Sequence, residues 1–442
     1  MKSIYLVSSF RGWLSALFFC SILLVHFNHQ AYAQMYVSGR HLYTQNNEKV
    51  ILRGVNEMFV WYGDKSGWSI YPEIEKTGAN CVRIAWNTAG STADLKNTIY
   101  NCVTRGKSIA MVTLMDATGD MSKLQSCLDY WKKADVKQAI QDFKKWTIVN
   151  IANEAGDNNV DDATYKSKYK DAISQLRNAG YTVPLVVDAT GWGQNFDQVQ
   201  RTWSEIFNSD PQRKTLFSVH PYWTSGGNDR INNMVNAVNN AGIPFIIGEG
   251  PEKVGWDCST GIDYKYAMQR FKEGEIGWMA WSWGGVRNGN CVSGNAYDMT
   301  TNGYYGSWTS DWGRDVAFYN TYSIKNTSVR PASLSSSNPF ARAETWVTPE
   351  LAESNEEESD VDVYPNPVRA EEIQVRIRKA ELIPAAITIN DESGKVVSDV
   401  YTATQKVSYI TIPVTALGSG YYIVTIAAQN GRTVSKKIII QK

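Results

Sequence analysis

The sequence predicts an α/β protein in which an eight-stranded (β/α)8 barrel is followed by a small all-β sandwich. Three observations support this prediction. Eight short apolar runs recur at intervals of about 28 to 38 residues, helix-like patterns separate them, and residues 361–442 alternate β-type runs with turn signals. With 442 residues, 43% of them hydrophobic, the chain is long enough to bury a core in each part.

The eight runs are rich in β-branched and apolar residues, and each ends at a polar residue or a glycine. They are residues 51–55, 81–85, 109–114, 147–151, 183–187, 216–219, 245–247 and 277–281. Helix-like patterns between them include residues 92–105, 135–146, 164–179, 230–241 and 264–273. A doubly wound open sheet is the alternative. Arg53-Gly54-Val55-Asn56, after the first run, lacks the glycine-rich phosphate turn typical of that fold.

Residues 1–33 have the pattern of a cleaved secretory signal. Lys2 and Arg11 precede an apolar run, and Ala31-Tyr32-Ala33 supplies the small-x-small pattern before Gln34. A membrane anchor is the alternative, but the apolar run over residues 12–27 is short for a bilayer. We therefore expect export, and a barrel that spans residues 34–335.

The composition changes after the barrel. Residues 344–360 carry seven acidic side chains and no basic one, which predicts a solvated linker over residues 336–360. Beyond it, β-type runs at 373–377, 386–389, 408–412, 421–427 and 437–440 alternate with turn signals such as Asn430-Gly431. Residues 361–442 therefore predict a β-sandwich domain.

Charge and histidine content exclude several kinds of ligand. The 44 basic side chains balance the 44 acidic ones, so we expect no nucleic-acid partner. Once the signal is removed, only His41 and His220 remain, which cannot build a multi-histidine metal site; we expect neither a metal nor another cofactor. The 16 tryptophans exceed what a core of this size needs, so some should face a ligand.

Five cysteines remain after the signal, and export makes disulfides possible. Cys258 and Cys291 follow the seventh and eighth runs and belong to one rim of the barrel, where we expect a bridge. Cys102 with Cys127 is a further possible pair. Cys81, inside a predicted strand, should behave as a small core residue.

Two glutamates come directly after strongly apolar runs. Glu154 follows the fourth run and Glu249 follows the seventh. The carboxyl ends of barrel strands meet at one mouth, so we expect these carboxylates to converge. Glycosidic cleavage needs such a pair, because one carboxylic acid protonates the leaving oxygen while the other group attacks the anomeric carbon. Either glutamate alone would also fit helix capping or a surface ion pair, so the prediction depends on the pair.

The surroundings of the two glutamates should give them different roles. Arg83, at the end of the second run, is expected to keep Glu249 ionised. Apolar surroundings and the nearby second carboxylate should hold Glu154 protonated near neutral pH. Asp116 ends the third run and is a further candidate for contact with a ligand.

Residues 36–334 resemble glycoside hydrolase family 5, and most of all its bacterial endo-β-1,4-mannanases. The resemblance covers the whole predicted barrel and rests on six motifs in order: Arg53-Gly54-Val55-Asn56, Val82-Arg83-Ile84, Asn153-Glu154, Ser218-Val219-His220-Pro221-Tyr222, Ile247-Gly248-Glu249 and Gly277-Trp278-Met279-Ala280-Trp281-Ser282-Trp283. It implies a retaining mechanism with Glu154 as acid/base, Glu249 as nucleophile and a covalent glycosyl-enzyme intermediate.

The same resemblance implies further roles. Asn153 would hold the sugar 2-hydroxyl, His220 and Tyr222 would tune the two carboxylates, and Trp281 would lie under the sugar that is cleaved. The family usually has a histidine before the aspartate at the third strand end, where this chain has Met115. Mannanase-like members often have Glu-Phe-Gly at the nucleophile, where Glu249 is followed here by glycine and proline.

Six tryptophans fall near strand ends or in the loops that follow them: Trp61, Trp86, Trp192, Trp223, Trp256 and Trp283. Some should line the cleft, and we count Trp192 and Trp223 as substrate-binding. We expect about half of the six rings to be buried in the core.

The C-terminal domain resembles the type IX secretion sorting domain. The residues that carry this resemblance are Val363-Tyr364-Pro365-Asn366-Pro367, Gly420-Tyr421-Tyr422 and Lys436-Lys437-Ile438-Ile439-Ile440. It implies a protein that crosses the inner membrane through the Sec pathway and reaches the cell surface or the medium through the type IX machinery. A carbohydrate-binding sandwich is the alternative.

Together these patterns predict a secreted, monomeric endo-β-1,4-mannanase whose partner is a β-linked polysaccharide. An endo-β-1,4-glucanase on the same barrel is the nearest alternative. A surface carbohydrate-binding barrel without activity is another, and Met115 is its only support. A metal-dependent hydrolase is disfavoured by the shortage of histidine ligands.

Overall fold

The computed structural model describes residues 34–61, 63–284, 296–336 and 339–340, and then 361–364, 368, 371–377, 384–391, 396–402, 409–429 and 433–442. The predicted signal and most of the predicted linker lie outside these residues. The chain forms two compact units, Met1–Thr345 and Trp346–Lys442, which are described separately.

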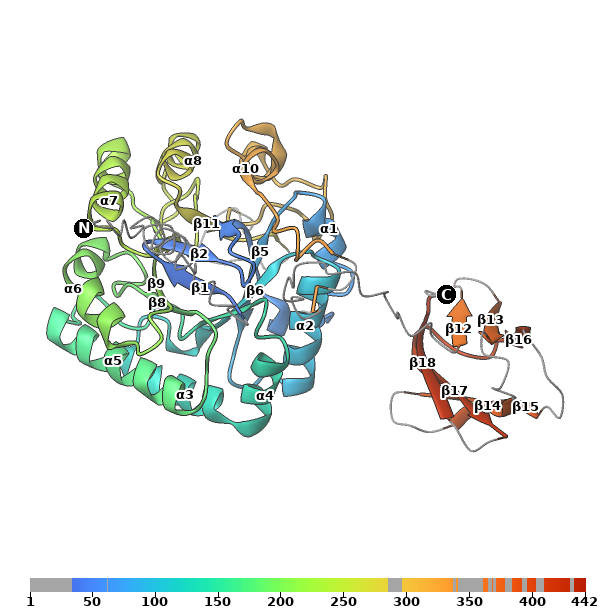
Figure 1. Ribbon diagram of the computed structural model, residues 1–442. Helices are drawn as coiled ribbons and strands as arrows, with labels where there is room; N and C mark the ends of the chain where they lie inside the picture. The colour runs from blue at the N-terminus through green and yellow to red at the C-terminus, as the bar shows by residue number, and fades with distance from the viewer. Residues whose placement is uncertain are drawn as a thin grey trace, which may run out of the picture. The chain divides into compact units, whose positions relative to one another are not determined.

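The first unit is a closed barrel of eight parallel strands (Figure 1). The strands are β4 (Arg53–Glu57), β5 (Cys81–Trp86), β6 (Ile109–Leu114), β7 (Thr147–Asn150), β8 (Leu185–Asp188), β9 (Thr215–Val219), β10 (Phe245–Ile247) and β11 (Gly277–Ala280). They pair in chain order, and β11 closes the barrel against β4. The predicted (β/α)8 fold is confirmed, and each predicted run overlaps one strand.

Helices surround the barrel. They are α1 (Tyr71–Glu75), α2 (Thr92–Thr104), α3 (Leu124–Lys132), α4 (Ala134–Asp142), α5 (Asp162–Asn178), α6 (Phe196–Ser209), α7 (Gly227–Ala241), α8 (Tyr264–Glu273), α9 (Asp311–Arg314) and α10 (Ile324–Thr327). Short turns of helix occur at η1 (Phe59–Trp61), η2 (Met115–Ala117), η3 (Met121–Lys123) and η4 (Asp315–Tyr319). The predicted helix over residues 135–146 is shorter in the structure, because Phe143 ends α4 with a non-helical backbone.

Side-chain caps explain where several of these helices begin. The side chains of Ser91, Asp161, Asn195 and Asp263 accept backbone N–H groups in the first turns of α2, α5, α6 and α8. These residue types are the preferred N-caps, because their side-chain oxygens satisfy donors that have no partner within the helix. The caps place each helix start directly after the loop that leaves a strand.

A small antiparallel sheet, not predicted from the sequence, lies at the amino ends of the barrel strands. Its strands are β1 (Tyr36–Ser38), β2 (His41–Tyr43) and β3 (Lys49–Val50). Leu42 and Val50 join an apolar cluster with barrel residues such as Met111 and Ile148. We call this cluster the apolar end of the barrel.

The end of the first unit packs against the barrel. Trp146 Nε1 donates a hydrogen bond to the backbone oxygen of Pro339 at 2.6 Å, and the Phe340 ring centroid lies 5.2 Å from that of Phe143. Pro339 and Phe340 fall in the segment predicted as linker. The packed part of the barrel unit therefore extends at least to Phe340.

The second unit is all β, as predicted. One sheet contains β12 (Val361–Tyr364), β13 (Glu372–Ile377) and β16 (Tyr409–Pro413), and the other contains β14 (Pro384–Asn390), β15 (Val396–Thr402), β17 (Gly420–Ala428) and β18 (Thr433–Ile440). Residues of both sheets, such as Ile373 and Ile426, share one apolar core. The first and fourth strands of this unit, β12 and β15, were not among the predicted runs.

None of the helices in the described ranges combines the length and the apolar character that crossing a bilayer would require.

Candidate active site

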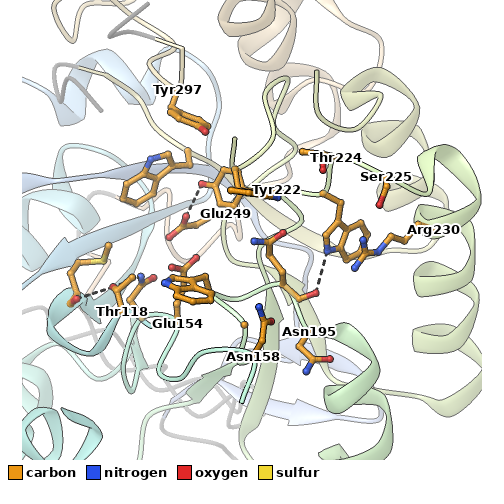
Figure 2. A pocket seen from close by; sticks show the side chains of 18 residues that line it. Thr118, Glu154, Asn158, Asn195, Tyr222, Thr224, Ser225, Arg230, Glu249 and Tyr297 are labelled. Atoms are coloured by element: carbon orange, nitrogen blue, oxygen red, sulfur yellow. Dashed lines mark hydrogen bonds between the residues drawn. The ribbon is translucent and has the colours of Figure 1, made fainter. Parts of the chain in front are cut away.

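A cleft of about 980 Å³ opens at the carboxyl ends of the barrel strands (Figure 2). Residues that follow six of the strands line it. They include Met115 and Thr118 after β6, Asn153 and Glu154 after β7, Trp192 after β8, Tyr222 and Trp223 after β9, Glu249 and Trp256 after β10, and Trp281 and Tyr297 after β11. This is the end of the barrel at which the sequence places its candidate residues.

The two predicted glutamates face each other in the cleft (Figure 2). One carboxylate oxygen of Glu154 lies within 4.8 Å of one of Glu249, and both side chains are almost fully buried. Glu154 Oε1 lies 2.7 Å from His220 Nδ1. Tyr222 donates its hydroxyl to Glu249 Oε2 at 2.7 Å.

The backbone of Glu154 adopts an unusual conformation. Its φ of 45° is in the left-handed region, which costs a residue with a side chain about 1 kcal/mol or more. The Glu154 N–H donates to Asp188 Oδ2 at 3.2 Å, which helps to hold this conformation. Strain of this kind concentrates at functional sites, where the surrounding structure maintains it.

Arg83 organises the buried floor of the cleft. Its guanidinium donates to Glu249 Oε1 at 2.8 Å and to Asn153 Oδ1 at 2.6 Å. Asn150 accepts two more of its N–H groups, and Asn56 accepts one at 2.9 Å. Because Arg83 is fully buried, it acts through the side chains that it holds.

Burial and neighbouring charge shift the pKa values of Glu154 and His220. Burial raises the pKa of Glu154, and the carboxylate of Glu249 raises it further, against the opposing effect of His220. Burial alone would lower the pKa of His220, but the carboxylates of Glu249, Asp188 and Glu154 outweigh it and raise that pKa. Glu154 and His220 therefore compete for a proton at a distance of 2.7 Å.

Two further acidic residues belong to the site and were not among the predicted site residues. Asp188, at the end of β8, is fully buried and lies 3.3 Å from Arg83 Nη2. Glu252 is buried three residues after Glu249, and its Oε1 accepts the backbone N–H of Trp281 at 2.7 Å. Burial raises the pKa of Glu252 well above its ordinary value. Asp188 ends β8, the kind of position at which a barrel places functional residues, whereas no sequence pattern points to Glu252.

The predicted tryptophans divide as expected between cleft and core. Among the six, Trp61, Trp192 and Trp256 are exposed, and the last two line the cleft. Trp86, Trp223 and Trp283 are buried. Trp281 also lines the cleft, with 7% of its surface exposed.

Two predicted contact residues lie differently from the expectation. Asp116 is outside the cleft lining, and its carboxylate accepts the Thr88 hydroxyl at 2.6 Å and the Thr88 N–H at 3.0 Å. It therefore braces two neighbouring loops. Trp223 touches the cleft but is only 2% exposed, because the Arg230 guanidinium lies 4.0 Å above its ring.

Glu154, His220 and Glu249 form the one group of three potential metal ligands that lie close together among the described residues. Arg83 Nη1 lies 2.8 Å from Glu249, and the raised pKa of His220 favours an imidazolium. These positive groups repel a cation, so we assign no metal to the cluster.

The buried cysteines Cys81, Cys102 and Cys127 are free thiols. The possible bridge between Cys102 and Cys127 is therefore wrong; Cys102 Sγ lies 3.5 Å from the backbone oxygen of Ser108 instead. Cys81 packs in the apolar end, as expected. Cys291 lies outside the described residues, so its bridge with Cys258 stays a prediction.

Comparison with known proteins identifies the family. Residues 43–286, more than half of the chain, match the family model described as cellulase (glycosyl hydrolase family 5). The chain belongs to glycosyl hydrolase family 5. This family 5 enzyme is thus a glycoside hydrolase.

The relatives of this family 5 enzyme include two curated mannan endo-1,4-beta-mannosidases. The protein of Cellvibrio japonicus is 32% identical over 307 residues, which cover 67% of this chain and 69% of that protein. The protein of Salipaludibacillus agaradhaerens is 32% identical over 291 residues, which cover 64% of this chain and 91% of that protein. The solved β-mannanase of Thermomonospora fusca has 28% identity and a TM-score of 0.61, with 69% of this chain and 100% of that chain covered.

Residues 362–441 match the secretion system C-terminal sorting domain. The second unit of this family 5 enzyme is therefore a type IX sorting domain, which directs the protein to the cell surface or the medium.

Proposed function

We propose that the enzyme is a retaining endo-β-1,4-mannanase, with Glu249 as nucleophile and Glu154 as acid/base. The observation that carries this proposal is that one carboxylate oxygen of Glu154 lies within 4.8 Å of one of Glu249. Retaining glycosidases hold their carboxyl groups about 5–5.5 Å apart, whereas inverting enzymes leave about 6.5–9.5 Å for a water molecule.

The first step forms a covalent intermediate. A Glu249 oxygen attacks the anomeric carbon and forms a carbon–oxygen bond, while the bond to the leaving sugar breaks and Glu154 gives its proton to the leaving oxygen. Arg83, at 2.8 Å, and the Tyr222 hydroxyl, at 2.7 Å, donate hydrogen bonds to Glu249 and hold the attacking carboxylate in place. The raised pKa of Glu154 keeps a proton available.

The second step releases the product. Glu154, now a carboxylate, takes a proton from a water molecule whose oxygen attacks the anomeric carbon, and the bond to Glu249 breaks. His220 Nδ1 lies 2.7 Å from Glu154 and 3.5 Å from Glu249, so it stabilises whichever carboxylate carries the charge at each stage.

We assign the remaining residues to substrate positioning. Asn153 donates to Thr118 at 2.9 Å and accepts from Arg83, which fixes the orientation of its amide toward the sugar 2-hydroxyl. The rings of Trp192 and Trp281 line the cleft and supply apolar faces for sugar stacking.

The substrate assignment rests on the mannanase relatives. An endo-β-1,4-glucanase is the second candidate, because the matching family model is itself described as cellulase. The test is hydrolysis of galactomannan and glucomannan beside carboxymethylcellulose, with Glu249→Ala as control. We expect cleavage of the mannans that disappears in the control. Cleavage of carboxymethylcellulose alone would reassign the enzyme as a glucanase.

Met115 lines the cleft at a position where the family resemblance implies a histidine, and the test therefore has a third outcome. A methionine side chain cannot donate a hydrogen bond to a sugar hydroxyl. Binding of both polymers without cleavage would show a carbohydrate-binding barrel that has lost its activity.

We also propose the organisation of the exported protein. A Sec signal over residues 1–33 precedes a monomeric catalytic barrel, an acidic linker and the sorting domain over residues 361–442. Cys258 and Cys291 form a disulfide on the active-site rim. Thiol labelling of the unfolded chain tests the bridge: it should modify three cysteines before reduction and five after it, given the three free thiols of the barrel.

A further inference from the structure

A second cavity opens beside the catalytic cleft and is lined by residues of α6, α7 and the loops before them. It has a volume of about 470 Å³, and we call it the side groove. The cleft and the side groove share four lining residues: Gln194, Asn195, Trp223 and Arg230. The side groove therefore lies directly beside the cleft, next to any group that branches from a chain bound there.

Trp223 and Arg230 form the wall between the two cavities. The indole of Trp223 donates to the Gln194 backbone oxygen at 3.2 Å, and the Arg230 guanidinium lies 4.0 Å from the ring centroid. Figure 2 shows Arg230 on the same side of the cleft as Asn195 and far from Tyr297. Because the guanidinium covers the ring, the wall offers N–H donors where an uncovered indole would offer a stacking face.

The side groove differs from the cleft in its chemistry. The cleft is lined by aromatic rings that suit the apolar faces of sugars in a chain, such as Trp192, Trp256 and Trp281. The side groove has exposed amides and carboxylates instead, from Asp197, Gln200, Asp229 and Asn233. Amides both donate to and accept from hydroxyls, and carboxylates accept from them.

The charges around the side groove disfavour an ionic ligand. Burial lowers the pKa of Arg230, and the negative charge of Asp197 opposes this effect in part. An anion would meet the carboxylates of Asp197 and Asp229, and a cation would meet Arg230. A neutral polyhydroxyl group is the ligand that fits both signs of charge.

The sequence of α7 adds a second observation. Six of its 15 residues are asparagine, which is a poor helix former. Asn232 accepts hydrogen bonds from Tyr266 and Arg270, and so has a structural role. Asn233 is exposed and lines the side groove, where its amide is placed for a ligand.

We propose that the side groove binds a single neutral sugar that branches from the β-linked chain in the cleft. The enzyme would then use this branch as a positive recognition element in a decorated mannan. This inference rests on the proposed mannanase activity.

The test fills the side groove with a large side chain. Asn233→Trp and Gln200→Trp each place an indole in it from one of the two helices. Asn240→Trp is the matched control, since Asn240 is an exposed residue of α7 about 10 Å further along the helix and outside the side-groove lining. The substrates are mannohexaose and the same backbone carrying one α-galactosyl branch, and thermal melting checks that each variant is folded.

We expect Asn233→Trp and Gln200→Trp to lower kcat/KM on the branched substrate at least fivefold and to leave mannohexaose unchanged, with no effect of Asn240→Trp. Equal kcat/KM of the wild type and both groove variants on the branched substrate would overturn the inference. So would failure of the wild type to cleave that substrate while it cleaves mannohexaose. Failure of the wild type on mannohexaose itself would instead refute the proposed mannanase activity.

Discussion

The two ends of the barrel interior are built by the same eight strands and have opposite chemistry. In β7, Ile148 belongs to the apolar end, whereas Asn150 accepts two hydrogen bonds from Arg83. In β8, Val186 lies in the apolar end and Asp188 pairs with Arg83. In each strand the two residues are two positions apart and so point to the same side. A step of about 7 Å along a strand therefore separates the apolar end from the candidate active site.

The comparison shows that burial at the apolar end stabilises the fold, whereas burial of ionisable groups at the other end costs free energy. Apolar side chains at one end gain free energy by burial, at about 25 cal/mol per Å². The other end buries three ionisable groups, Arg83, Asp188 and Glu249. Burial removes their hydration, which costs free energy unless hydrogen-bond and charge partners compensate. The hydrogen bonds around Arg83 supply those partners, and they also fix Glu249, the proposed nucleophile, in place.

We call the end that holds Arg83, Glu154 and Glu249 the polar end of the barrel. The largest effect is expected there, on proton transfer to the leaving oxygen. Glu154→Gln should lower kcat on mannan by about 10² to 10⁴-fold, because glutamine cannot protonate the leaving oxygen. An aryl β-mannoside with an acidic phenol needs no such proton for its first step. Initial rates of glycosyl-enzyme formation should therefore fall much less on the aryl substrate than on mannan. Equal losses on the two substrates would mean that Glu154 is not the acid.

The matching change at the apolar end should affect stability alone. Ile148→Ala leaves a cavity and should lower the free energy of unfolding by about 2–5 kcal/mol, measured by denaturant titration. Ile148→Val, which removes one methylene group, should cost about 0.5–1.5 kcal/mol. The kcat of both variants should stay at the wild-type value under conditions where they are folded. A fall in kcat with normal folding would break the separation between the two ends.

A smaller effect is expected on the pKa of Glu154. The Glu249 carboxylate raises that pKa, so Glu249→Gln removes a negative neighbour and should lower it. Titration of the ¹³C-labelled Glu154 carboxyl by NMR measures the shift, and Glu252→Gln serves as the control. In the wild type, kcat/KM should fall on the alkaline side only when Glu154 loses its proton, above the range of an ordinary glutamate. An unchanged pKa in Glu249→Gln would show that the two carboxyl groups do not interact.

The smallest effect is expected at Glu252. Burial raises the pKa of Glu252 well above its ordinary value and so favours the uncharged form, and Glu252→Gln keeps an oxygen that accepts the Trp281 N–H. We expect a stability change of less than about 0.5 kcal/mol and unchanged kcat. Glu252→Met leaves that buried donor unpaired and should cost about 1–3 kcal/mol in unfolding free energy. If glutamine were as damaging as methionine, the negative charge itself would be required.

The sequence predicts which main residues form the polar end, but not all of the contacts that support them. Glu154, Glu249, Arg83 and His220 were predicted from strand ends and from the family resemblance, and the structure brings all four together. Strand ends are readable because an apolar run stops where a polar residue begins. Glu252 was not predicted, since its partner is a backbone N–H 29 residues away, and no local pattern records such a contact.

Other differences have similar causes. The sequence placed Asp116 at the mouth of the barrel correctly, but the rotamer that turns it toward Thr88 depends on the neighbouring loop. The strands β1 to β3 are two or three residues long, too short for a period-two pattern to stand out. Trp223 is buried because Arg230, seven residues later, folds over its ring.

The contact of Phe340 with Phe143 sets the shortest chain that holds a complete barrel. An enzyme trimmed back to Leu334 would expose the Phe143 ring and leave the Trp146 indole without the Pro339 oxygen that it now meets at 2.6 Å. Any proteolytic maturation that detaches the sorting domain and spares the barrel must therefore cut beyond Phe340. The same position is the natural end point for a recombinant catalytic domain.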